Sequence, residues 1–348
     1  MTRLHVILPN DIDDPAMPSG GNHYDRRVLD ALAAAGWAVH EHDIHGTWPA
    51  PGADTRAELA RVLAGLPDGA LVLIDGLVGS AVPDVLVPEG DRLRQVILMH
   101  MPFAADGERQ VLAVSRAIVS TSHWTERRLR ELYGLPAGRI HVATPGVDPA
   151  PPAAGSDEGT RLLCVAAVDR HKGHDILVDA LGSTADLAWS CTCVGSLTRA
   201  PAFVEELRRQ VAGLGIADRL ELAGARIGAD LAASYAAADL FVLATRGETY
   251  GMVVTEALSR GIPVLATAAG GLPDALGRAP DGTVPGLLVP PDDPAALAAA
   301  LRRWLTEPDL RRDLRRSAAL RREALTGWDV TARQVATALS AVPAGVPA

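Results

Sequence analysis

Short apolar runs alternate along the chain with longer amphipathic or alanine-rich segments. A run such as Leu71-Val72-Leu73-Ile74 is continuously apolar, which is typical of a strand in a sheet covered on both faces. The alternation of such strands with helix-length segments indicates parallel sheets with crossover helices. In the first half we predict strands at Leu4–Leu8, Ala38–Asp43, Ala70–Asp75, Gln95–Met99, Ala117–Ser120 and Ile140–Thr144, and helices at Asn22–Ala35, Thr55–Leu66 and Trp124–Tyr133.

A segment rich in Pro, Ala, Gly, Ser and Asp, from Pro145 to Gly159, interrupts this pattern and predicts a linker. The alternation then resumes, with predicted strands at Arg161–Ala166, Trp189–Val194, Leu220–Ala223, Leu240–Leu243, Pro263–Thr267 and Leu287–Val289. The chain is helical from Pro294 onward, with breaks at Pro308 and Gly327. We therefore predict an α/β protein with one Rossmann-like domain over residues 1–148, a linker over 149–160, a second such domain over 161–325 and a helical segment over 326–348.

Composition narrows the function classes. The chain of 348 residues is 48% apolar and 22% charged, as in an ordinary globular enzyme. Its net charge of −9 disfavours nucleic acid as a partner. No apolar run approaches the ~20 residues that span a bilayer, and the N-terminus lacks the pattern of a secretory leader. We expect a cytoplasmic protein without an integral membrane segment. The sequence does not indicate its oligomeric state.

Three cysteines lie in apolar, strand-like stretches: Cys164, Cys191 and Cys193. This placement and their odd number predict buried free thiols in a reducing compartment. A single Cys-x-Cys pair with no second pair is weak evidence for zinc, so the sequence predicts no metal site.

The segment from Arg246 to Leu258 carries the most informative pattern. It follows a predicted buried strand and opens a helix near Gly251. The first free amides of that helix carry positive partial charge and can hold a diphosphate. Glu248 and Glu256 flank this position, and carboxylates accept hydrogen bonds from sugar hydroxyls. The pattern suits a sugar–diphosphate–ribose ligand; by spacing alone, solvated surface glutamates remain the alternative.

A second cluster, Arg170-His171-Lys172-Gly173, lies between a predicted strand and a predicted helix. Cations at a helix N-terminus oppose the helix dipole, so their presence needs another cause. A bound diphosphate would supply it, since Arg offers a bidentate fork and Lys a point charge. A solvated basic turn is the alternative.

Two further features follow strands of the first half. Gly20-Gly21 comes after the first strand, where paired glycines permit close backbone approach to a ligand or a tight turn into the helix. His100 comes at the carboxyl end of a buried strand, the end at which ligands bind in such sheets. A structural histidine is the alternative there.

Together these features resemble family 4 of the retaining glycosyltransferases, whose GT-B fold has two Rossmann-like domains facing across a cleft. The matching positions span nearly the whole chain: Gly20-Gly21, His100, Pro145-Gly146-Val147-Asp148, Lys172-Gly173 with Leu177 and Ala180-Leu181, Glu248 with Glu256 as a Glu-x7-Glu motif, Gly261-Ile262-Pro263-Val264, and Gly270-Gly271-Leu272-Pro273. Each motif alone is weak, but their number and order make the resemblance strong.

The resemblance implies a retaining, metal-independent transfer of a sugar, of the hexosyltransferase type, from a nucleotide-diphosphate sugar to an acceptor hydroxyl. Lys172 and the amides of Tyr250, Gly251, Met252 and Val253 would bind the donor diphosphate, and Glu256 the ribose. Glu248 and His100 would contact the transferred sugar, with Gly20 and Gly21 nearby.

The resemblance leaves the substrates open. It suggests a UDP- or GDP-linked donor, no further cofactor, and a small-molecule, glycan or lipid-linked acceptor. It also implies a last helix that crosses back to the first domain and buries Val330, Val335 and Leu339 there.

Three positions depart from the family pattern. Ala166-Ala167 replaces the usual Gly-Arg, so we expect Arg170 to substitute for the missing phosphate-binding Arg. Asp274 replaces the usual Glu, and Pro145 the interdomain Asn. Asp11-Ile12-Asp13 matches a metal-binding Asp-x-Asp only superficially, and its place after the first strand predicts a polar surface loop.

Two other functions fit the same fold. A nucleotide-sugar epimerase or hydrolase would share the diphosphate site without joining a second sugar, and a non-catalytic module would only sense a nucleotide sugar. The combination of Lys172, Glu248 and His100 favours transfer over both.

Overall fold

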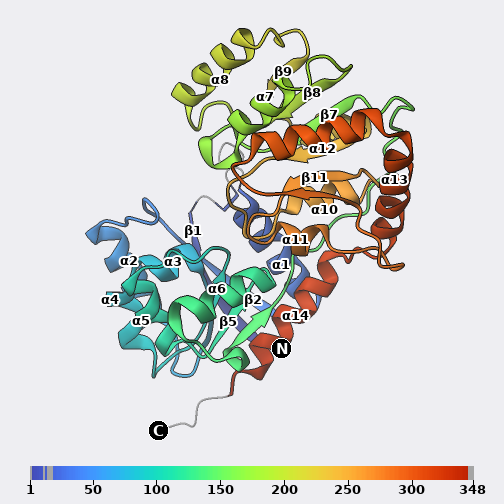
Figure 1. Cartoon of the computed structure of the whole chain (residues 1–348). Coiled ribbons are helices and arrows are strands. Elements are labelled where there is room, and N and C mark those ends of the chain that lie inside the picture. Colours follow the sequence, from blue (N-terminus) through green and yellow to red (C-terminus); the bar gives the residue numbers. More distant parts are fainter. Residues whose placement is uncertain (1, 11, 14–18, 344–348) are drawn as a thin grey trace. The chain divides into compact units, whose positions relative to one another are not determined.

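The computed structural model describes residues 2–10, 12–13 and 19–343, and these form two compact units (Figure 1). Unit 1 contains the chain up to Gly146 together with the C-terminal segment from Thr326, and unit 2 contains Val147–Leu325. Each unit is built on a six-stranded parallel sheet flanked by helices. The two Rossmann-like sheets predicted from the alternation of apolar and polar segments are confirmed.

Unit 1 has the strand order β2-β1-β3-β4-β5-β6. Its elements are β1 (Arg3–Pro9), α1 (Gly20–Ala34), β2 (Ala38–Ile44), α2 (Ala53–Ala64), β3 (Leu71–Asp75), α3 (Gly76–Ala81), α4 (Pro83–Leu86), β4 (Arg94–Met99), α5 (Asp106–Val114), β5 (Ala117–Ser120), α6 (His123–Tyr133), β6 (Ile140–Val142) and α14 (Trp328–Ala341). Since β1 pairs with both β2 and β3, the chain reverses its direction across the sheet between β1 and β3. In such sheets the crevice at this switch point receives ligands.

Unit 2 has the order β12-β11-β10-β7-β8-β9. Its elements are β7 (Arg161–Val165), α7 (His174–Gly182), β8 (Ser190–Val194), α8 (Pro201–Gly213), β9 (Leu220–Gly224), α9 (Gly228–Ala236), β10 (Leu240–Leu243), α10 (Met252–Leu258), β11 (Val264–Thr267), α11 (Leu272–Leu276), β12 (Gly286–Val289), α12 (Pro294–Thr306) and α13 (Pro308–Glu323). Its switch point lies between β7 and β10.

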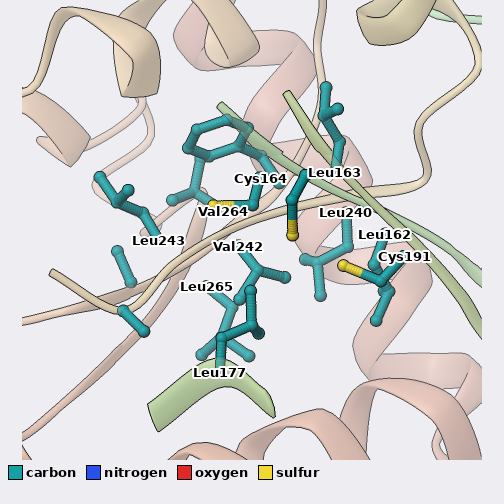
Figure 2. Close-up of a cluster of buried hydrophobic side chains, with 14 of the residues drawn as sticks. Leu162, Leu163, Cys164, Leu177, Cys191, Leu240, Val242, Leu243, Val264 and Leu265 are labelled. Carbon is teal, nitrogen blue, oxygen red and sulfur yellow. The ribbon is translucent and has the colours of Figure 1, made fainter. Parts of the chain in front are cut away.

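The core of unit 2 forms between the sheet and the helices that cover it. Figure 2 shows side chains from β7, β10 and β11 gathered with Leu177 of α7, including the fully buried Val242 and Leu265. The thiols of Cys164 and Cys191 lie in this apolar environment and are free and buried, as the sequence predicts.

Residues of the predicted linker pack on unit 2. Asp239, buried just before β10, accepts hydrogen bonds from the amide and the hydroxyl of Ser156 and from the amide of Arg161 (2.8 Å). The amide of Ala153 donates to the carbonyl of Arg260 at 2.9 Å. This stretch is therefore held by hydrogen bonds, which its Pro- and Gly-rich composition does not predict.

Helix α14 packs on α1, β5 and β6 of unit 1 (Figure 1). Trp328 meets the Tyr24 ring edge-on at 5.7 Å between centroids, and the Thr331 hydroxyl donates to the carbonyl of Thr144 at 2.8 Å. Val335 and Leu339 are buried, whereas Val330, which we expected to be buried with them, is only half-buried.

Among the described residues, no helix combines the length and the apolar character that crossing a bilayer requires.

Truncation of a buried α14 side chain should destabilise unit 1. Leu339→Ala leaves a cavity against this unit and should lower its free energy of unfolding by about 2–5 kcal/mol. The exposed Gln334→Ala on the same helix is the matched control and should change it by no more than about 0.5 kcal/mol. Urea denaturation read by hydrogen exchange of unit 1 amides measures both; equal effects of the two substitutions would contradict the packing.

Candidate functional site

The switch point of unit 2 brings Lys172 and Glu248 together. Lys172 ends a short 3-10 turn, η3 (Arg170–Lys172), which follows β7, and Glu248 lies in the loop after β10. Because β7 and β10 are neighbours in the sheet, both loops leave the same edge side by side. Lys172 Nζ lies 2.7 Å from Glu248 Oε2, and the two side chains are 24% and 17% exposed. This is a half-buried ion pair at the edge where ligands bind.

Glycine allows the η3 turn to pack against the end of β10. Gly173 has φ +68°, and a Cβ there would lie 2.0 Å from the carbonyl oxygen of Ala244. Two donors fix the turn from the other side: the amide of Arg246 and the hydroxyl of Thr245 both donate to the carbonyl of His171, at 2.8 and 3.1 Å. The position of Lys172 is thus set by backbone contacts that only glycine permits.

A second glycine pair holds the loop that carries Glu248. A Cβ on Gly270 would lie 1.9 Å from the carbonyl oxygen of Glu248, and one on Gly271 would lie 2.2 Å from that of Thr249. The Gly271 amide donates to the carbonyl of Glu248 at 2.7 Å. The glycine pair recognised in the sequence therefore acts by close approach to this loop.

Helix α10 begins after Gly251, which has φ +100°. The Tyr250 side chain is buried, and burial raises the pKa of its hydroxyl to about 12. Met252 and Val253 are half-buried and are the first two residues of the helix, a position where backbone amides have no carbonyl partner one turn earlier in the helix.

Glu256 lies on α10 and has a partner that the sequence did not reveal. The hydroxyl of Tyr235, a fully buried residue of α9, donates to Glu256 Oε2 at 2.8 Å. The Arg260 guanidinium covers the Tyr235 ring at 4.4 Å and donates to the carbonyl of Glu256 at 2.8 Å. Tyr235 and Arg260 thus orient the carboxylate and the backbone of Glu256.

The Arg170 side chain, expected at the phosphate position, has other partners in the structure. It forms an ion pair with Glu206 of α8, lies over the Phe203 ring at 4.9 Å, and is 64% exposed. Arg246 instead joins the two loops: it makes a bidentate ion pair with Asp175 at the start of α7 and donates to the carbonyl of Arg170.

Unit 1 has a separate charged cluster near its own switch point. His100 Nε2 lies 2.7 Å from Asp25 Oδ1 and 3.7 Å from Asp75 Oδ2. Asp75 ends β3 and caps α3 by accepting from the amides of Leu77 and Val78. Gly21 lies beside the imidazole, since a Cβ there would come within 3.4 Å of the His100 ring, while Gly20 starts α1.

The two carboxylates determine the protonation of His100. Burial alone lowers the pKa of His100, but the charge and hydrogen bond of Asp25, with a contribution from Asp75, raise it to about 9. Burial, reinforced by the charge of Asp25, raises the pKa of Asp75 to about 7. His100 is therefore an imidazolium at neutral pH, able to donate a hydrogen bond to a sugar or phosphate oxygen.

Two groups of described residues place three potential metal-ligand atoms within 4.8 Å of one another: Asp25, Asp75 and His100 in unit 1, and Cys164, His174 and Cys193 in unit 2. In the unit 1 group, the ion pairs of His100 with Asp25 and Asp75 already explain why the three side chains lie close together. Of the Asp-x-Asp look-alike, Asp11 lies outside the described residues, and Asp13 forms an ion pair with Arg26 at 2.7 Å.

The sequence therefore identified residues that lie close together within each unit. It did not identify the side chains that form ion pairs or hydrogen bonds with them. Asp25, Asp75 and Tyr235 carry no motif. Two weak signals were present for the aspartates: Asp25 follows Gly21 by about one helical turn, and Asp75 ends a predicted strand. For Tyr235 there was none, since its contact with Glu256 spans two helices.

Residues 159–307 match the family described as "Glycosyl transferases group 1". They form a glycosyl transferases group 1 domain. This group 1 domain contains Lys172, Glu248 and Glu256, with the β7 and β10 loops that carry them.

The chain is also similar to proteins of known name. It is 33% identical over 279 residues to the D-inositol 3-phosphate glycosyltransferase of Thermobispora bispora, covering 74% of this chain and 62% of that protein. Two further relatives with this name match the chain over 57% of their own length. The chain thus spans about three fifths of the length of these relatives.

Solved structures share the fold of both units. A glycosyltransferase from Rickettsia africae superposes with a TM-score of 0.78 over 98% of both chains at 16% identity. Anabaena Alr3699/HepE, solved in complex with UDP and glucose, gives a TM-score of 0.72 over 97% of this chain and 99% of that one, at 19% identity. The predicted GT-B fold class is confirmed.

Removal of the Asp25 charge should lower the pKa of His100. In the Asp25→Asn variant Asp75 is the remaining carboxylate at the imidazole, and the pKa of His100 should fall clearly below about 9, as measured by NMR titration of the imidazole. Because the folded-state value exceeds the unfolded one, the stabilisation of unit 1 by this charge is complete below about pH 6.5 and lost as the pH rises through about 9.

The exposed Asp54→Asn in α2 is the control and should leave the titration of His100 unchanged. An unaltered His100 titration in Asp25→Asn would show that the ion pair does not set its charge.

Proposed function

We propose that the protein is a retaining, metal-independent glycosyltransferase that moves a sugar from a nucleoside-diphosphate sugar to an acceptor hydroxyl. The observation that carries this proposal is the half-buried ion pair of Lys172 and Glu248 at the switch point of a group 1 domain, with Glu256 on the helix that follows. It combines a cation for the diphosphate with carboxylates for two sets of sugar hydroxyls.

In the proposed reaction the bond between the anomeric carbon and the β-phosphate oxygen breaks, and negative charge grows on the departing diphosphate. The acceptor oxygen forms a bond to the same carbon, and the proton of the acceptor hydroxyl passes to the departing diphosphate. The Lys172 ammonium and the amides from Tyr250 to Val253 would stabilise that charge. When a diphosphate approaches Lys172, Glu248 is freed to accept hydrogen bonds from the transferred sugar. Preorganised charge of this kind is usually the largest single contribution to catalysis.

Glu256 would bind the ribose of the donor. Its carboxylate is oriented by Tyr235, and the second oxygen remains as an acceptor for a vicinal diol. The half-buried position favours strong hydrogen bonds, because the surrounding dielectric is lower than that of water. Arg170 would reach the phosphates only after leaving Glu206, a change that donor binding would have to drive.

We propose that His100 of unit 1, which is protonated and lies beside Gly21, contacts the transferred sugar and the acceptor. Its imidazolium would donate a charge-assisted hydrogen bond to a sugar oxygen.

The names of similar proteins suggest substrates. UDP and glucose are bound by Anabaena Alr3699/HepE, which supports a UDP-linked donor, with a GDP-linked donor as the other candidate. The relatives named D-inositol 3-phosphate glycosyltransferase suggest a small phosphorylated polyol as acceptor, alongside glycan and lipid-linked acceptors. We propose a cytoplasmic protein that needs no resident cofactor. An epimerase or hydrolase is separated from a transferase by testing the donor with and without acceptors.

The two glutamates should have separable roles. Glu256→Ala should weaken the binding of the nucleoside diphosphate, and Tyr235→Phe, which removes only the orienting hydroxyl, should weaken it by roughly fivefold, equivalent to about 1 kcal/mol. Glu248→Ala should lower turnover while leaving nucleoside diphosphate affinity nearly intact. Calorimetric titration with UDP and GDP checks this, and an equal loss of affinity in both glutamate variants would refute the assignment.

Lys172 should replace a divalent ion at the diphosphate. Lys172→Ala should lower kcat by a factor on the order of 10²–10³, the scale for losing one preorganised stabilising group. Wild-type activity should survive EDTA. Arg208→Ala, an exposed cation of α8 that pairs only with Glu205 among its described contacts, is the control and should be fully active. Loss of activity in EDTA with recovery on adding Mn²⁺ or Mg²⁺ would overturn metal independence.

A further inference from the structure

The loop that follows His100 exposes two apolar side chains. Residues 101–105 lie between β4 and α5 and have the sequence Met-Pro-Phe-Ala-Ala, so the loop contains no charged side chain. Among the described residues of unit 1, Met101 and Phe103 are the most exposed of the large apolar side chains, at 50% and 36%. A single exposed apolar residue is ordinary at a protein surface, but these two share one loop directly after the histidine of the candidate site.

A buried carboxylate holds this loop in place. Glu108, in the first turn of α5, is 1% exposed, and its Oε2 accepts hydrogen bonds from the amides of Phe103 at 3.0 Å and Ala104 at 3.2 Å. The Ser80 hydroxyl of α3 donates to Oε1 at 2.8 Å, and the Tyr133 hydroxyl of α6 donates to Oε2. Burial and this contact raise the pKa of the Tyr133 hydroxyl, so it remains a donor. One side chain therefore ties the loop to three helices.

The loop is held in a conformation that costs free energy. Ala104 has φ +59° and is one of two non-glycine residues with a positive φ in the described part of the chain. Burial of a carboxylate is also costly, and it is tolerated where several donors compensate it. Capping of α5 alone would not require this arrangement, since a glutamate in the first turn caps its helix through one amide next to it. The network therefore fixes the loop itself.

We propose that Met101 and Phe103 bind an apolar group of the acceptor, and that Glu108 is the positioning residue for this contact. The proposal rests on the proposed transferase function and makes its acceptor more specific. His100 is the residue proposed to contact the acceptor. A group bonded next to the reacting hydroxyl would therefore meet the residues that follow His100 in the chain.

The chemistry of the loop selects the class of acceptor. An aromatic ring and a thioether bind aromatic or alkyl groups by burying apolar surface. A phosphate group would instead need cations or free backbone amides. Residues 101–105 carry no cation, and the amides of Phe103 and Ala104 already donate to Glu108. The loop therefore favours an acceptor with an aromatic or alkyl group over a small phosphorylated polyol.

Binding is tested by NMR on the full chain, labelled with ¹³C in its methionine methyl groups. The protein is titrated with phenyl β-glucoside and with methyl β-glucoside, which has the same sugar without the large apolar group. Phenyl β-glucoside should shift the Met101 methyl resonance through the ring current of its phenyl group, and methyl β-glucoside should not. Met101→Leu assigns the resonance, and the fully buried Met99 is the internal control, which should shift far less. Equal shifts of Met101 with both glucosides, or with neither, would overturn the proposal.

Kinetics of transfer to the same two glucosides test the roles of the residues. Phe103→Ala should raise the KM for phenyl β-glucoside roughly tenfold, because partial burial of one aromatic side chain contributes on that scale. The KM for the donor should stay unchanged. Glu108→Ala should also raise the acceptor KM, and Glu108→Gln should restore part of it, because its amide oxygen still accepts from the loop amides. Ile227→Ala, which removes a 73% exposed apolar side chain of unit 2, is the control and should match the wild type.

The outcomes separate this inference from the proposed function. Transfer to phenyl β-glucoside with the same KM in Phe103→Ala and wild type would overturn the acceptor contact and leave the transferase function standing. A Met101 shift without transfer to any acceptor would overturn the transferase function instead. Binding to phospholipid vesicles that is lost in Phe103→Ala, with no change in KM, would assign the loop to a membrane surface and refute the proposal.

Discussion

Close backbone contact at the carboxyl edge of the unit 2 sheet is the constraint on which the candidate donor site depends. The loops after β7, β10 and β11 approach one another so closely that a Cβ at Gly173, Gly270 or Gly271 would overlap a carbonyl oxygen. Glycine is the residue that permits this approach, and at Gly173 and Gly270 it also adopts a positive φ. Because the loops are joined through their backbones, the side chains of Lys172 and Glu248 are held within 2.7 Å across 76 residues of sequence.

Each unit concentrates charge at its own switch point. In unit 2 a cation and a carboxylate face each other, and a second carboxylate is oriented by a buried tyrosine. In unit 1 two buried carboxylates surround a histidine and keep it protonated. Charges in half-buried positions cost desolvation free energy, which a folded protein tolerates where function requires it. Both clusters lie at the carboxyl ends of their sheets, where the general rule for open α/β sheets places ligands.

The local pattern of the sequence was sufficient for much of the fold. Continuous apolar runs predicted the strands because parallel strands are covered on both faces, and every strand appeared within a few residues of its predicted bounds. The motifs placed Lys172 and Glu248 in loops that follow strands. They placed His100 directly after a strand and Gly21 at the start of the helix that follows β1. The attachment of the linker to unit 2 was less predictable from the sequence, because the hydrogen bonds of Ser156 to Asp239 join residues 83 positions apart.

The sequence by itself determined the two parallel sheets, the residues at their carboxyl ends and the resemblance to a family. Only the tertiary structure decided the partners of those residues: Asp25 and Asp75 with His100, Tyr235 with Glu256, and Glu206 with Arg170. It also brought Ser80 and Tyr133 to the carboxylate of Glu108. The reason is physical. Periodicity and turn chemistry are set by neighbours along the chain, whereas an ion pair or a buried hydrogen-bond network depends on distances between side chains that become neighbours only when helices pack on sheets.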